Sequence, residues 1–436
     1  MGTLIIRGKY ILSENGLQED WSIKIKDNLI DAVGPDAEII EVEGDEVLQM
    51  KDRLIVPGFI NGHMHMYGVL SHGITAEALV TEFSSFLEDF WWPYVEDRLD
   101  HELVRITTEW ACVEMIKSGI TCFADILEGP NSIPGALNIE TEVVRKAGLR
   151  GVLSFEACER LSSKNGEAGL IENAEFIKEN NFKGSLIQGM MSVHTLFTSS
   201  KEFLMKAKNL SDEIGCDIHM HLSESIFEPE WALKNYGKRP IEVYEDLGYL
   251  SNKVFASQLV QVDDKELDIF ANSGARAVSM PLSNCEVGGG VAPVTKMIER
   301  GIKVGLGTDG YINNFFEVMR GAFLIHKAYL RDPQVMPAKL VFEMATSMGA
   351  QAIGIESAGS LKVGNLADMI ALDLNLPTPI NRHNVYDQII LFMNPENVQD
   401  VIVNGRFLKR DGKLTTLDEK EIKARLRDVA KKFWNG

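Results

Sequence analysis

Cysteine is rare in this sequence, and its cysteines are not spaced as pairs. The 436 residues contain five of them, Cys112, Cys122, Cys158, Cys216 and Cys285, without a C-x-x-C motif. An odd number of scattered cysteines in a long chain argues against a disulfide framework, which is typical of short secreted domains. We therefore expect reduced, mostly buried thiols and a cytoplasmic protein.

Long apolar runs are also missing. No stretch approaches the length of about 18 apolar residues that indicates a membrane-spanning helix. The opening stretch MGTLIIRGKYILSENG carries charges throughout and has no apolar segment of the kind found in signal peptides. We therefore expect neither a membrane span nor a signal peptide.

Basic residues are fewer than acidic residues. The chain has 44 Lys and Arg against 63 Asp and Glu, a formal net charge of -19. Binding to nucleic acid phosphates needs a basic surface, so nucleic acid is excluded as an expected partner. The composition is otherwise that of an ordinary globular protein, with 45% hydrophobic residues.

What the chain does contain is a repeated alternation of strand-like and helix-like segments. The apolar, β-rich segments are RLIVPGFINGH, GITCFADI, RGVLSFEA, SLIQGMMSVH, DIHMHLSE, KVFASQLVQ, ARAVSMPLS and IKVGLGTDG. Pieces between them, such as HELVRITTEWACVEMIKSG, carry apolar residues at helical spacing. Eight such repeats predict an α/β fold, a parallel (β/α)8 TIM barrel. The alternative is an open doubly wound sheet, which the absence of G-x-G-x-x-G after the first strand disfavours.

The two ends of the chain differ from this middle part. TLIIRGKYILSENG and WSIKIKDNLIDAVG near the start, and ADMIALDLN and VQDVIVNGRFLKRDGKL near the end, read as strands closed by turns. We expect residues 1–54 and 362–436 to form one small β-sandwich, with residues 55–361 forming the barrel. The stretch LDEKEIKARLRDVAKKFW predicts a terminal helix, in which Asp418 and Glu421 resemble a capping box.

Histidines gather at the predicted strand ends, where TIM barrels carry their chemistry. Five of the nine lie there: His63 and His65 after the first strand, His194 after the fourth, and His219 and His221 in the fifth. Side chains at i and i+2 of a strand point to one face, so His63 and His65 can reach one ion. The other four histidines are His72, His101, His326 and His383. We expect a packing role for His326 and assign no function to the other three.

Acidic residues complete the pattern of a metal site. Asp309 closes the eighth strand, and Glu224 follows His221 by three residues. Two histidines from one strand, one from a second and an aspartate from a third suit Zn²⁺, with Fe²⁺ as the alternative. Glu224 at an open metal site can move a proton, although a lone loop glutamate is otherwise an ordinary solvated acid.

These motifs resemble the amidohydrolase superfamily, in its mononuclear-metal branch of cytosine, guanine and adenosine-type deaminases and triazine hydrolases. The similarity is carried by PGFINGHMHM, MSVHTLFTSS, IHMHLSES, MPLSNCEVGGGVAPV, GLGTDG, GSLKVGNLADMIALD and DVIVNGRFLKRDGKL, and it covers nearly the whole chain.

The resemblance implies one divalent metal ion per chain, held by His63, His65, His221 and Asp309. It implies a metal-bound hydroxide that attacks the C–NH2 carbon of a small amino-substituted N-heterocycle and releases ammonia. Glu224 and Asp309 would be the catalytic residues and His194 would contact the substrate, while His219 would lie deeper in the core. Similar enzymes are often homo-oligomers.

The sequence departs from the family at the sixth strand. The family has a histidine where ASQLVQV carries Gln258. Glutamine forms hydrogen bonds but cannot carry a proton at neutral pH. We expect Gln258 to orient an unusual substrate. The alternatives are that the chemistry rests on Glu224 and Asp309 alone, or that the enzyme is slow on the family's substrates.

Three further residues lie near the predicted site. Trp92 is a candidate for the entrance, or is part of the core. Glu156 and Arg160 follow the third strand and either meet polar substrate groups or form a surface salt bridge.

Several other functions fit the same scaffold. A triazine chlorohydrolase or N-alkylaminohydrolase would differ only in its leaving group. A binuclear cyclic amide hydrolase would need a bridging lysine in the fourth strand, but GSLIQGMMSVH has none and Lys183 precedes it. A catalytically silent binding protein is suggested only by Gln258.

Overall fold

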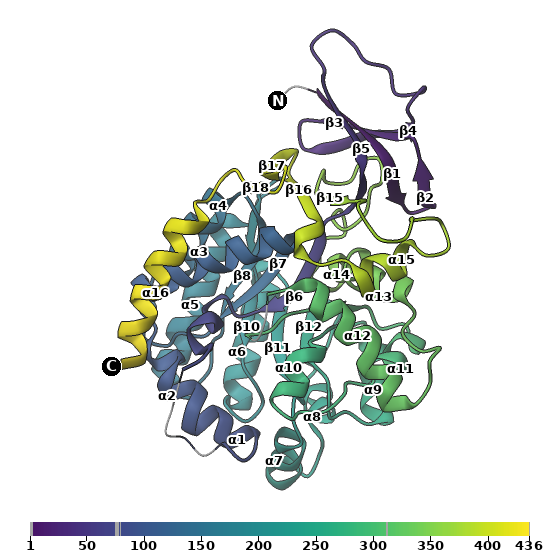
Figure 1. Cartoon of the computed structure of the whole chain (residues 1–436). Helices are drawn as coiled ribbons and strands as arrows, with labels where there is room; N and C mark the ends of the chain where they lie inside the picture. The colour runs from purple at the N-terminus through teal and green to yellow at the C-terminus, as the bar shows by residue number, and fades with distance from the viewer. Residues whose placement is uncertain (1–2, 75–77, 79, 311–312, 436) are drawn as a thin grey trace.

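Two parallel sheets, of four and five strands, form the centre of the protein, and they contain all eight predicted strand segments (Figure 1). The structure, a computed structural model, describes residues 3–74, 78, 80–310 and 313–435. One parallel sheet has the order β6 (Phe59–Met64), β7 (Ile120–Leu127), β8 (Arg150–Phe155) and β9 (Ile187–Gly189). The other has the order β10 (Met191–Val193), β11 (Ile218–Leu222), β12 (Val254–Gln258), β13 (Arg276–Ser279) and β14 (Val304–Leu306).

The fourth predicted strand is divided between the two sheets. β9 pairs with β8 and β10 pairs with β11, so the chain passes from one sheet to the other at Met190. Isolated parallel bridges join the two sheets: Met64 of β6 pairs with Asp309 after β14, and Ala157 after β8 pairs with Val193 of β10. Strand order follows chain order in both sheets, without the reversal that defines a doubly wound fold. The doubly wound alternative is therefore wrong.

Helices surround these sheets and fix where each strand ends. They are α3 (His101–Ser118), α4 (Ala136–Ala147), α5 (Ser163–Asn180), α6 (Lys201–Ile214), α7 (Phe227–Tyr236), α8 (Pro240–Asp246), α9 (Asp264–Ser273), α10 (Pro281–Glu286), α11 (Val294–Glu299), α12 (Phe315–Leu330), α13 (Ala338–Met344) and α14 (Ser347–Ala352). α3 begins where the Asp100 carboxylate accepts the N–H of Leu103, and it ends at Gly119, whose φ is 85°. A side-chain cap satisfies free N–H groups at the start of a helix. A glycine with positive φ at the end of a helix lets the chain turn toward the next strand.

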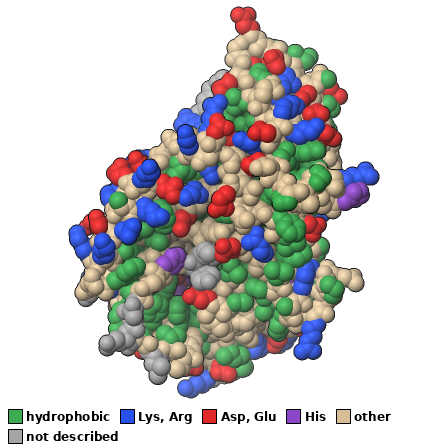
Figure 2. All heavy atoms as spheres, viewed as in Figure 1, with side chains coloured by type: hydrophobic (Ala, Val, Ile, Leu, Met, Phe, Trp, Pro, Cys, Tyr) green, Lys and Arg blue, Asp and Glu red, His purple; other side chains and the backbone are tan. Residues whose placement is uncertain are grey.

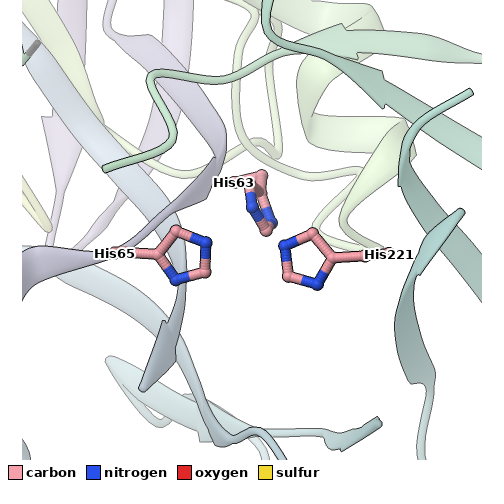
Figure 3. A group of neighbouring side chains, drawn as sticks. All are labelled: His63, His65 and His221. Carbon is pink, nitrogen blue, oxygen red and sulfur yellow. The ribbon is translucent and has the colours of Figure 1, made fainter. Parts of the chain in front are cut away.

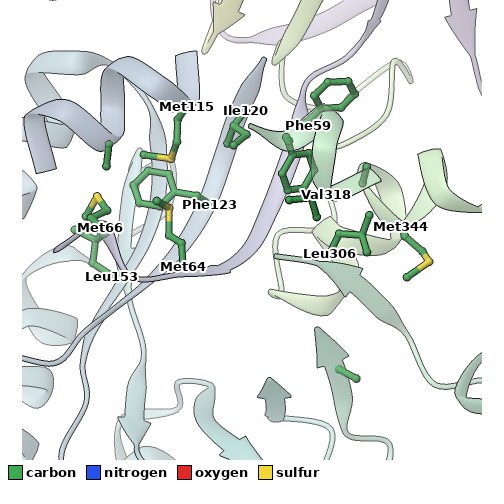
Figure 4. Packing of buried hydrophobic residues seen from close by; sticks show 14 of the residues in the cluster. Phe59, Met64, Met66, Met115, Ile120, Phe123, Leu153, Leu306, Val318 and Met344 are labelled. Atoms are coloured by element: carbon green, nitrogen blue, oxygen red, sulfur yellow. The ribbon is translucent and has the colours of Figure 1, made fainter. Parts of the chain in front are cut away.

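The core lies between the strands and the helices. Met64 of β6, Phe123 of β7 and Met115 of α3 pack together, each fully buried (Figure 4). The chain segment after β6 is less regular: it contains η1 (Met66–Ser71), α1 (Phe83–Ser85), η2 (Phe86–Trp91), α2 (Trp92–Tyr94) and η3 (Glu96–Arg98). This segment contributes to the cavity described below.

The two ends of the chain share one nine-stranded sheet. From the start come β1 (Thr3–Ser13), β2 (Gly16–Glu19), β3 (Trp21–Lys26), β4 (Leu29–Pro35) and β5 (Glu46–Pro57), and from the end β15 (Met369–Asp373), β16 (Val398–Val403), β17 (Arg406–Arg410) and β18 (Lys413–Leu414). β5 pairs with β1 and with β15, and so joins the two ends. It continues past residue 54 almost directly into β6, so the first parallel strand is attached to this sheet.

The predicted terminal helix is α16 (Glu419–Asn435). The Asp418 carboxylate accepts the N–H of Glu421 at 3.0 Å, as the sequence predicts. The helix lies along α3 (Figure 1). Near its end, Nε1 of Trp434 donates to the carbonyl of Leu70 at 2.8 Å.

All five cysteines are free thiols, and Cys112, Cys122 and Cys216 are buried. In the described part of the chain, no helix combines the length and the apolar character that a membrane span needs.

A buried ion pair connects a central strand to the end sheet. Nε of Arg150 in β8 lies 2.7 Å from Oδ2 of Asp368, and the two side chains are 6% and 1% exposed. Breaking a buried pair leaves an uncompensated charge. The variant Arg150→Met should therefore lower the free energy of unfolding by about 3–5 kcal/mol, measured by urea denaturation. The double variant Arg150→Met/Asp368→Asn should recover part of that loss, and equal losses in both variants would contradict this account.

Candidate metal centre and active site

Three histidines from two strands meet at one point. The nearest donor nitrogens of His63, His65 and His221 all lie within 4.8 Å of one another. The ring centroid of His63 is 4.8 Å from that of His65 and 4.8 Å from that of His221. Figure 3 shows the three rings turned toward a common space. The structure thus brings together the three histidines that the resemblance implies as metal ligands.

Asp309, the fourth implied ligand, joins this group from the end of β14. Its Oδ1 lies 3.2 Å from Nε2 of His65 and 3.9 Å from Nε2 of His63. The backbone N–H of Asp309 donates to the carbonyl of His63 at 3.1 Å, and its φ is 60°. The bridge between the two sheets therefore fixes the carboxylate beside the histidines.

Hydrogen bonds orient two of the three rings. Nδ1 of His65 lies 2.7 Å from the carbonyl of Ile126 and so donates to it. Nδ1 of His221 lies 2.7 Å from Oε1 of Glu156, which is itself buried. A ligating histidine typically donates its second N–H to a carbonyl or carboxylate, which directs the other nitrogen to the metal. Glu156 is therefore a buried acid and not a surface one, and it is placed to orient His221.

His63 provides the test of whether a metal fits. It is 0% exposed, and neither of its ring nitrogens has a hydrogen-bond partner. Burying an unpaired polar group is costly, so such a group calls for a partner. Three imidazoles and one carboxylate form a donor set that suits Zn²⁺. The residues present therefore fit a single divalent cation.

The carboxylate of Asp309 and the imidazole of His65 each stabilise the charged form of the other. Burial raises the pKa of Asp309, but the hydrogen bond and charge of His65 and the charges of His63 and His221 outweigh it and hold that pKa well below its usual range. Burial lowers the pKa of His65, but the hydrogen bond and charge of Asp309 outweigh it and raise the pKa to about 9. The site thus pairs an ionised carboxylate with a protonated imidazole, and a bound cation would take the place of the proton on Nε2 of His65.

Glu224 lies in the loop after β11 and lines the same cavity as His65, His221 and Asp309. Burial, followed by the negative charges of Asp309, Glu228 and Glu156, raises the pKa of Glu224 well above its usual range. A raised pKa keeps the proton on this carboxyl group to a higher pH than on a free glutamate, as a group that delivers a proton requires.

Glu228 fixes the loop that carries Glu224. Its two carboxylate oxygens accept the N–H of Ser223 at 2.5 Å and the N–H of Leu196 at 3.0 Å. Ser223 itself has a φ of 51°. Glu228 thereby ties the loop after β11 to the loop after β10, and sequence reasoning did not find this role.

His194 and His219 have different surroundings. Nδ1 of His194 lies 2.9 Å from Oγ1 of Thr195, which leaves Nε2 available to the cavity that His194 lines. His219 is fully buried, and its two nitrogens lie 3.0 Å and 3.2 Å from the hydroxyls of Ser192 and Ser257. The prediction that His219 is a core residue is confirmed.

Gln258, at the end of β12, contacts Asp309. Its Nε2 donates to Oδ2 of Asp309 at 2.7 Å, and the hydroxyl of Ser283 donates to the same oxygen at 3.0 Å. Its Oε1 is buried without a partner, and its φ is 80°. Among the described residues that line the cavity, Gln258 does not occur. Contact with substrate thus stays a prediction, while contact with Asp309 is observed.

Replacing this glutamine tests its effect on Asp309. In Gln258→Leu the carboxylate loses a donor while the apolar volume is largely kept. We expect kcat to fall about 10–100-fold, the usual effect of removing an outer partner of a metal ligand. Steady-state kinetics and metal analysis measure this. Gln258→His, which restores a ring N–H donor, should lose less, and unchanged kcat in Gln258→Leu would contradict the role.

The main cavity has a volume of about 450 Å³. Besides the predicted residues, it is lined by His72, Glu128, Ser283 and Glu286 and by an apolar group from residues 83–91. His72 received no function from the sequence, because nothing local indicates that its loop returns to the site.

Trp92 does not line this main cavity. It lines a small adjoining one, where the guanidinium carbon of Arg160 lies 4.7 Å from the centre of its ring. The neighbouring Trp91 lines the main cavity instead. Arg160 is paired with Glu96 at 3.1 Å and with Asp97 at 2.8 Å, and its side chain is 11% exposed, so the ion pair is largely buried.

A second group of donors, Glu128, Glu156, His194 and His221, also lies close enough to hold an ion. It shares His221 with the first group, and Nδ1 of His221 is hydrogen-bonded to Glu156. A second ion there would have to displace this hydrogen bond. The geometry therefore favours one ion over the binuclear alternative.

Comparison with known protein families identifies one match. Residues 54–408 match the model of the Amidohydrolase family. The chain is 32% identical to a 5-methylthioadenosine/S-adenosylhomocysteine deaminase from Thermodesulfovibrio yellowstonii, over 96% of each chain. It is also 32% identical to a 5'-deoxyadenosine deaminase from Methanosarcina acetivorans, over 99% of each chain.

Solved structures with the same fold include an adenosine deaminase from Xanthomonas campestris with bound zinc. Its TM-score is 0.90 at 22% identity, over 99% of each chain. An atrazine chlorohydrolase from Arthrobacter aurescens complexed with zinc has a TM-score of 0.86 at 20% identity, over 98% of this chain and 100% of that one. At these identities the likeness concerns the fold.

Proposed function

This chain belongs to the amidohydrolase family, and we propose that it is a metal-dependent hydrolytic deaminase of an adenosine-type nucleoside. The names of relatives at 32% identity, which act on 5'-deoxyadenosine or on 5-methylthioadenosine and S-adenosylhomocysteine, support this substrate class. The observation that carries the proposal is the convergence of His63, His65, His221 and Asp309, of which the last three line the same cavity as Glu224.

We propose a more specific architecture than two separate parallel sheets. We take them as the two parts of one (β/α)8 barrel, which the bridges from Met64 to Asp309 and from Ala157 to Val193 support. We keep residues 55–361 as the barrel, and residues 1–54 and 362–436 as a β-sandwich domain with a terminal helix. A cytoplasmic homo-oligomer is likewise part of the proposal.

The proposed cofactor is one Zn²⁺ per chain, with Fe²⁺ as the alternative. His63, His65, His221 and Asp309 would hold it. When bound, such a cation supplies a Lewis acid that makes water nucleophilic near neutral pH. Removal by a chelator should abolish activity, and one equivalent per chain should restore it.

The side chains of this protein then perform the proton transfers. Glu224 takes a proton from the attacking water and delivers it to the departing amino nitrogen. A C–O bond forms at the ring carbon and the C–N bond breaks, so that ammonia leaves; the proton of the new hydroxyl group passes to the adjacent ring nitrogen, and the ring keeps a carbonyl. Gln258 and Ser283 hold Oδ2 of Asp309, which leaves Oδ1 toward the histidines to orient the water.

His194 has the geometry for substrate binding. Its Nδ1 is occupied by Thr195, so Nε2 can meet a ring nitrogen of the base. Gln258 remains a proposed substrate contact through its unpaired Oε1.

The test is ammonia release from zinc-loaded protein. Adenosine, 5'-deoxyadenosine and 5'-methylthioadenosine should be converted to the corresponding inosine compounds, which chromatography identifies. Cytosine, guanine and atrazine in the same panel test the other substrates and leaving groups, and a cyclic amide tests the binuclear alternative. Turnover of atrazine or the cyclic amide, without turnover of any nucleoside, would overturn the proposal.

A further inference from the structure

One part of the main cavity is lined by apolar side chains alone. Phe83, Phe86, Leu87, Phe90 and Trp91, here called the apolar wall, all line it. Phe86 and Trp91 stack at a centroid distance of 5.6 Å and an interplanar angle of 26°. Phe86 also contacts Phe83 at 6.4 Å and Phe90 at 5.8 Å. The wall is therefore one packed surface, available to an apolar group of a ligand.

Ring contacts connect this wall to the candidate metal centre. Tyr67 lies 5.5 Å from His65 and 6.0 Å from Trp91, measured between ring centroids. A Cβ placed on Gly310, the residue after Asp309, would lie 3.1 Å from Cη2 of Trp91. Trp91 thus borders the reacting end, Phe86 and Phe90 contact Trp91, and Phe83 contacts Phe86. A nucleoside whose amino group reaches the metal centre must direct its sugar end along this wall or out of the cavity.

Apart from its histidines, the charged side chains of the lining are all acidic. Its acidic residues are Glu128, Glu224, Glu286 and Asp309, and none of its described residues is Lys or Arg. The stretches 75–77, 79 and 311–312, for which the structure gives no description, contain no Lys or Arg either. A carboxylate or phosphate on the sugar end, directed away from the candidate metal centre, would therefore lose water without gaining a Lys or Arg partner, which is strongly unfavourable.

Arg160 is the cation of the adjoining small cavity, which shares Glu128 and His194 with the main one. It is already paired with Glu96 and Asp97 and lies over the ring of Trp92. Recruiting it for a substrate anion would leave Glu96, which is 1% exposed, as a buried unpaired acid. On the outer surface, by contrast, acidic and basic side chains lie interspersed, as Figure 2 shows.

We propose that this deaminase accepts nucleosides whose 5' substituent is uncharged and apolar, and that it discriminates against those with a carboxylate or phosphate there. The inference rests on the proposed function and narrows it. The inference distinguishes between the substrates for which the relatives are named. 5'-Deoxyadenosine and 5'-methylthioadenosine have apolar 5' ends, whereas S-adenosylhomocysteine ends in a carboxylate and an ammonium group. The ammonium group would find acidic partners in this cavity, but the carboxylate would find none.

The first experiment compares substrates that differ only at the 5' position. With zinc-loaded protein, kcat/KM for 5'-deoxyadenosine and 5'-methylthioadenosine should exceed that for S-adenosylhomocysteine and adenosine 5'-monophosphate by at least about 100-fold. Calorimetric titration of Glu224→Gln with the same compounds should show the same order in Kd. Equal values across the series would overturn the inference and leave the deaminase function intact. Failure of every nucleoside to react or bind would overturn both.

The second experiment introduces the missing cation. Phe86→Arg should raise kcat/KM for adenosine 5'-monophosphate relative to 5'-deoxyadenosine by about 10-fold. The matched variant Phe86→Leu should leave this ratio as in the parent protein. Glu286→Gln, which removes one acid from an exposed position of the lining, should move the ratio in the same direction as Phe86→Arg without disturbing the packed wall. No change of the ratio in either charge variant would overturn the inference.

Discussion

Replacing Glu224 by glutamine is expected to lower kcat by about 10²–10⁴-fold, the range that a positioned general acid and base contributes. Glutamine keeps the shape of the side chain but cannot accept and release the proton. Burial and neighbouring charges raise the pKa of Glu224 well above its usual range, which suits a group that must carry a proton at neutral pH. The measurements are the rate of ammonia release and the pH profile of kcat.

The control for this variant is Glu230→Gln, an exposed acid on α7. It should retain the parent kcat. Glu224→Gln should still contain one equivalent of metal and unfold at the parent temperature, because Glu224 is not among the proposed ligands. Retained kcat in Glu224→Gln would contradict its role as the proton carrier.

Replacing His63 by asparagine is expected to remove both the metal and the activity. His63 is fully buried, and its nitrogens have no hydrogen-bond partner within the protein, so the metal is the partner we propose for it. The loss of metal affinity should exceed the roughly 10–100-fold that follows from removing an outer partner of a ligand. Metal analysis after gel filtration measures it, together with ammonia release.

His383→Asn provides the matched control, because His383 is exposed and its N–H and ring contacts are with its own neighbours. It should retain metal and activity. Thermal unfolding distinguishes loss of metal from loss of fold. His63→Asn that keeps one equivalent of tightly bound metal would contradict the proposed ligand set, even if the variant were inactive.

The positions of the histidines at strand ends were predictable because a short stretch of sequence is enough to identify a strand and its end. The segment DIHMHLSE identifies a strand, and the period of two places His219 and His221 on one face without any knowledge of the rest of the chain. The eight strand segments appear in the structure, and the resemblance to the amidohydrolase superfamily is confirmed by the match over residues 54–408. That resemblance was needed to choose His221 and not His194 or His219 as the third histidine.

Side-chain contacts between residues far apart in the chain were not predictable in this way. Glu156 lies 65 positions before His221, and no local pattern relates the two, yet their side chains are 2.7 Å apart. Gln258 illustrates the same limit. The sequence predicted an unusual residue at that position, whereas its contact with Asp309, 51 positions later, depends on how β12 and β14 lie in the sheet.

The alternation of strands and helices, the donors at the strand ends and the excess of acidic residues depend on residue type and short spacing, so they can be predicted without a structure. The folded chain is needed to show which donors face one another, that Trp91 and not Trp92 lines the main cavity, and that Arg160 is already paired. These features depend on contacts between segments that lie far apart in the chain. The energies of these contacts are set by burial, which no single segment specifies.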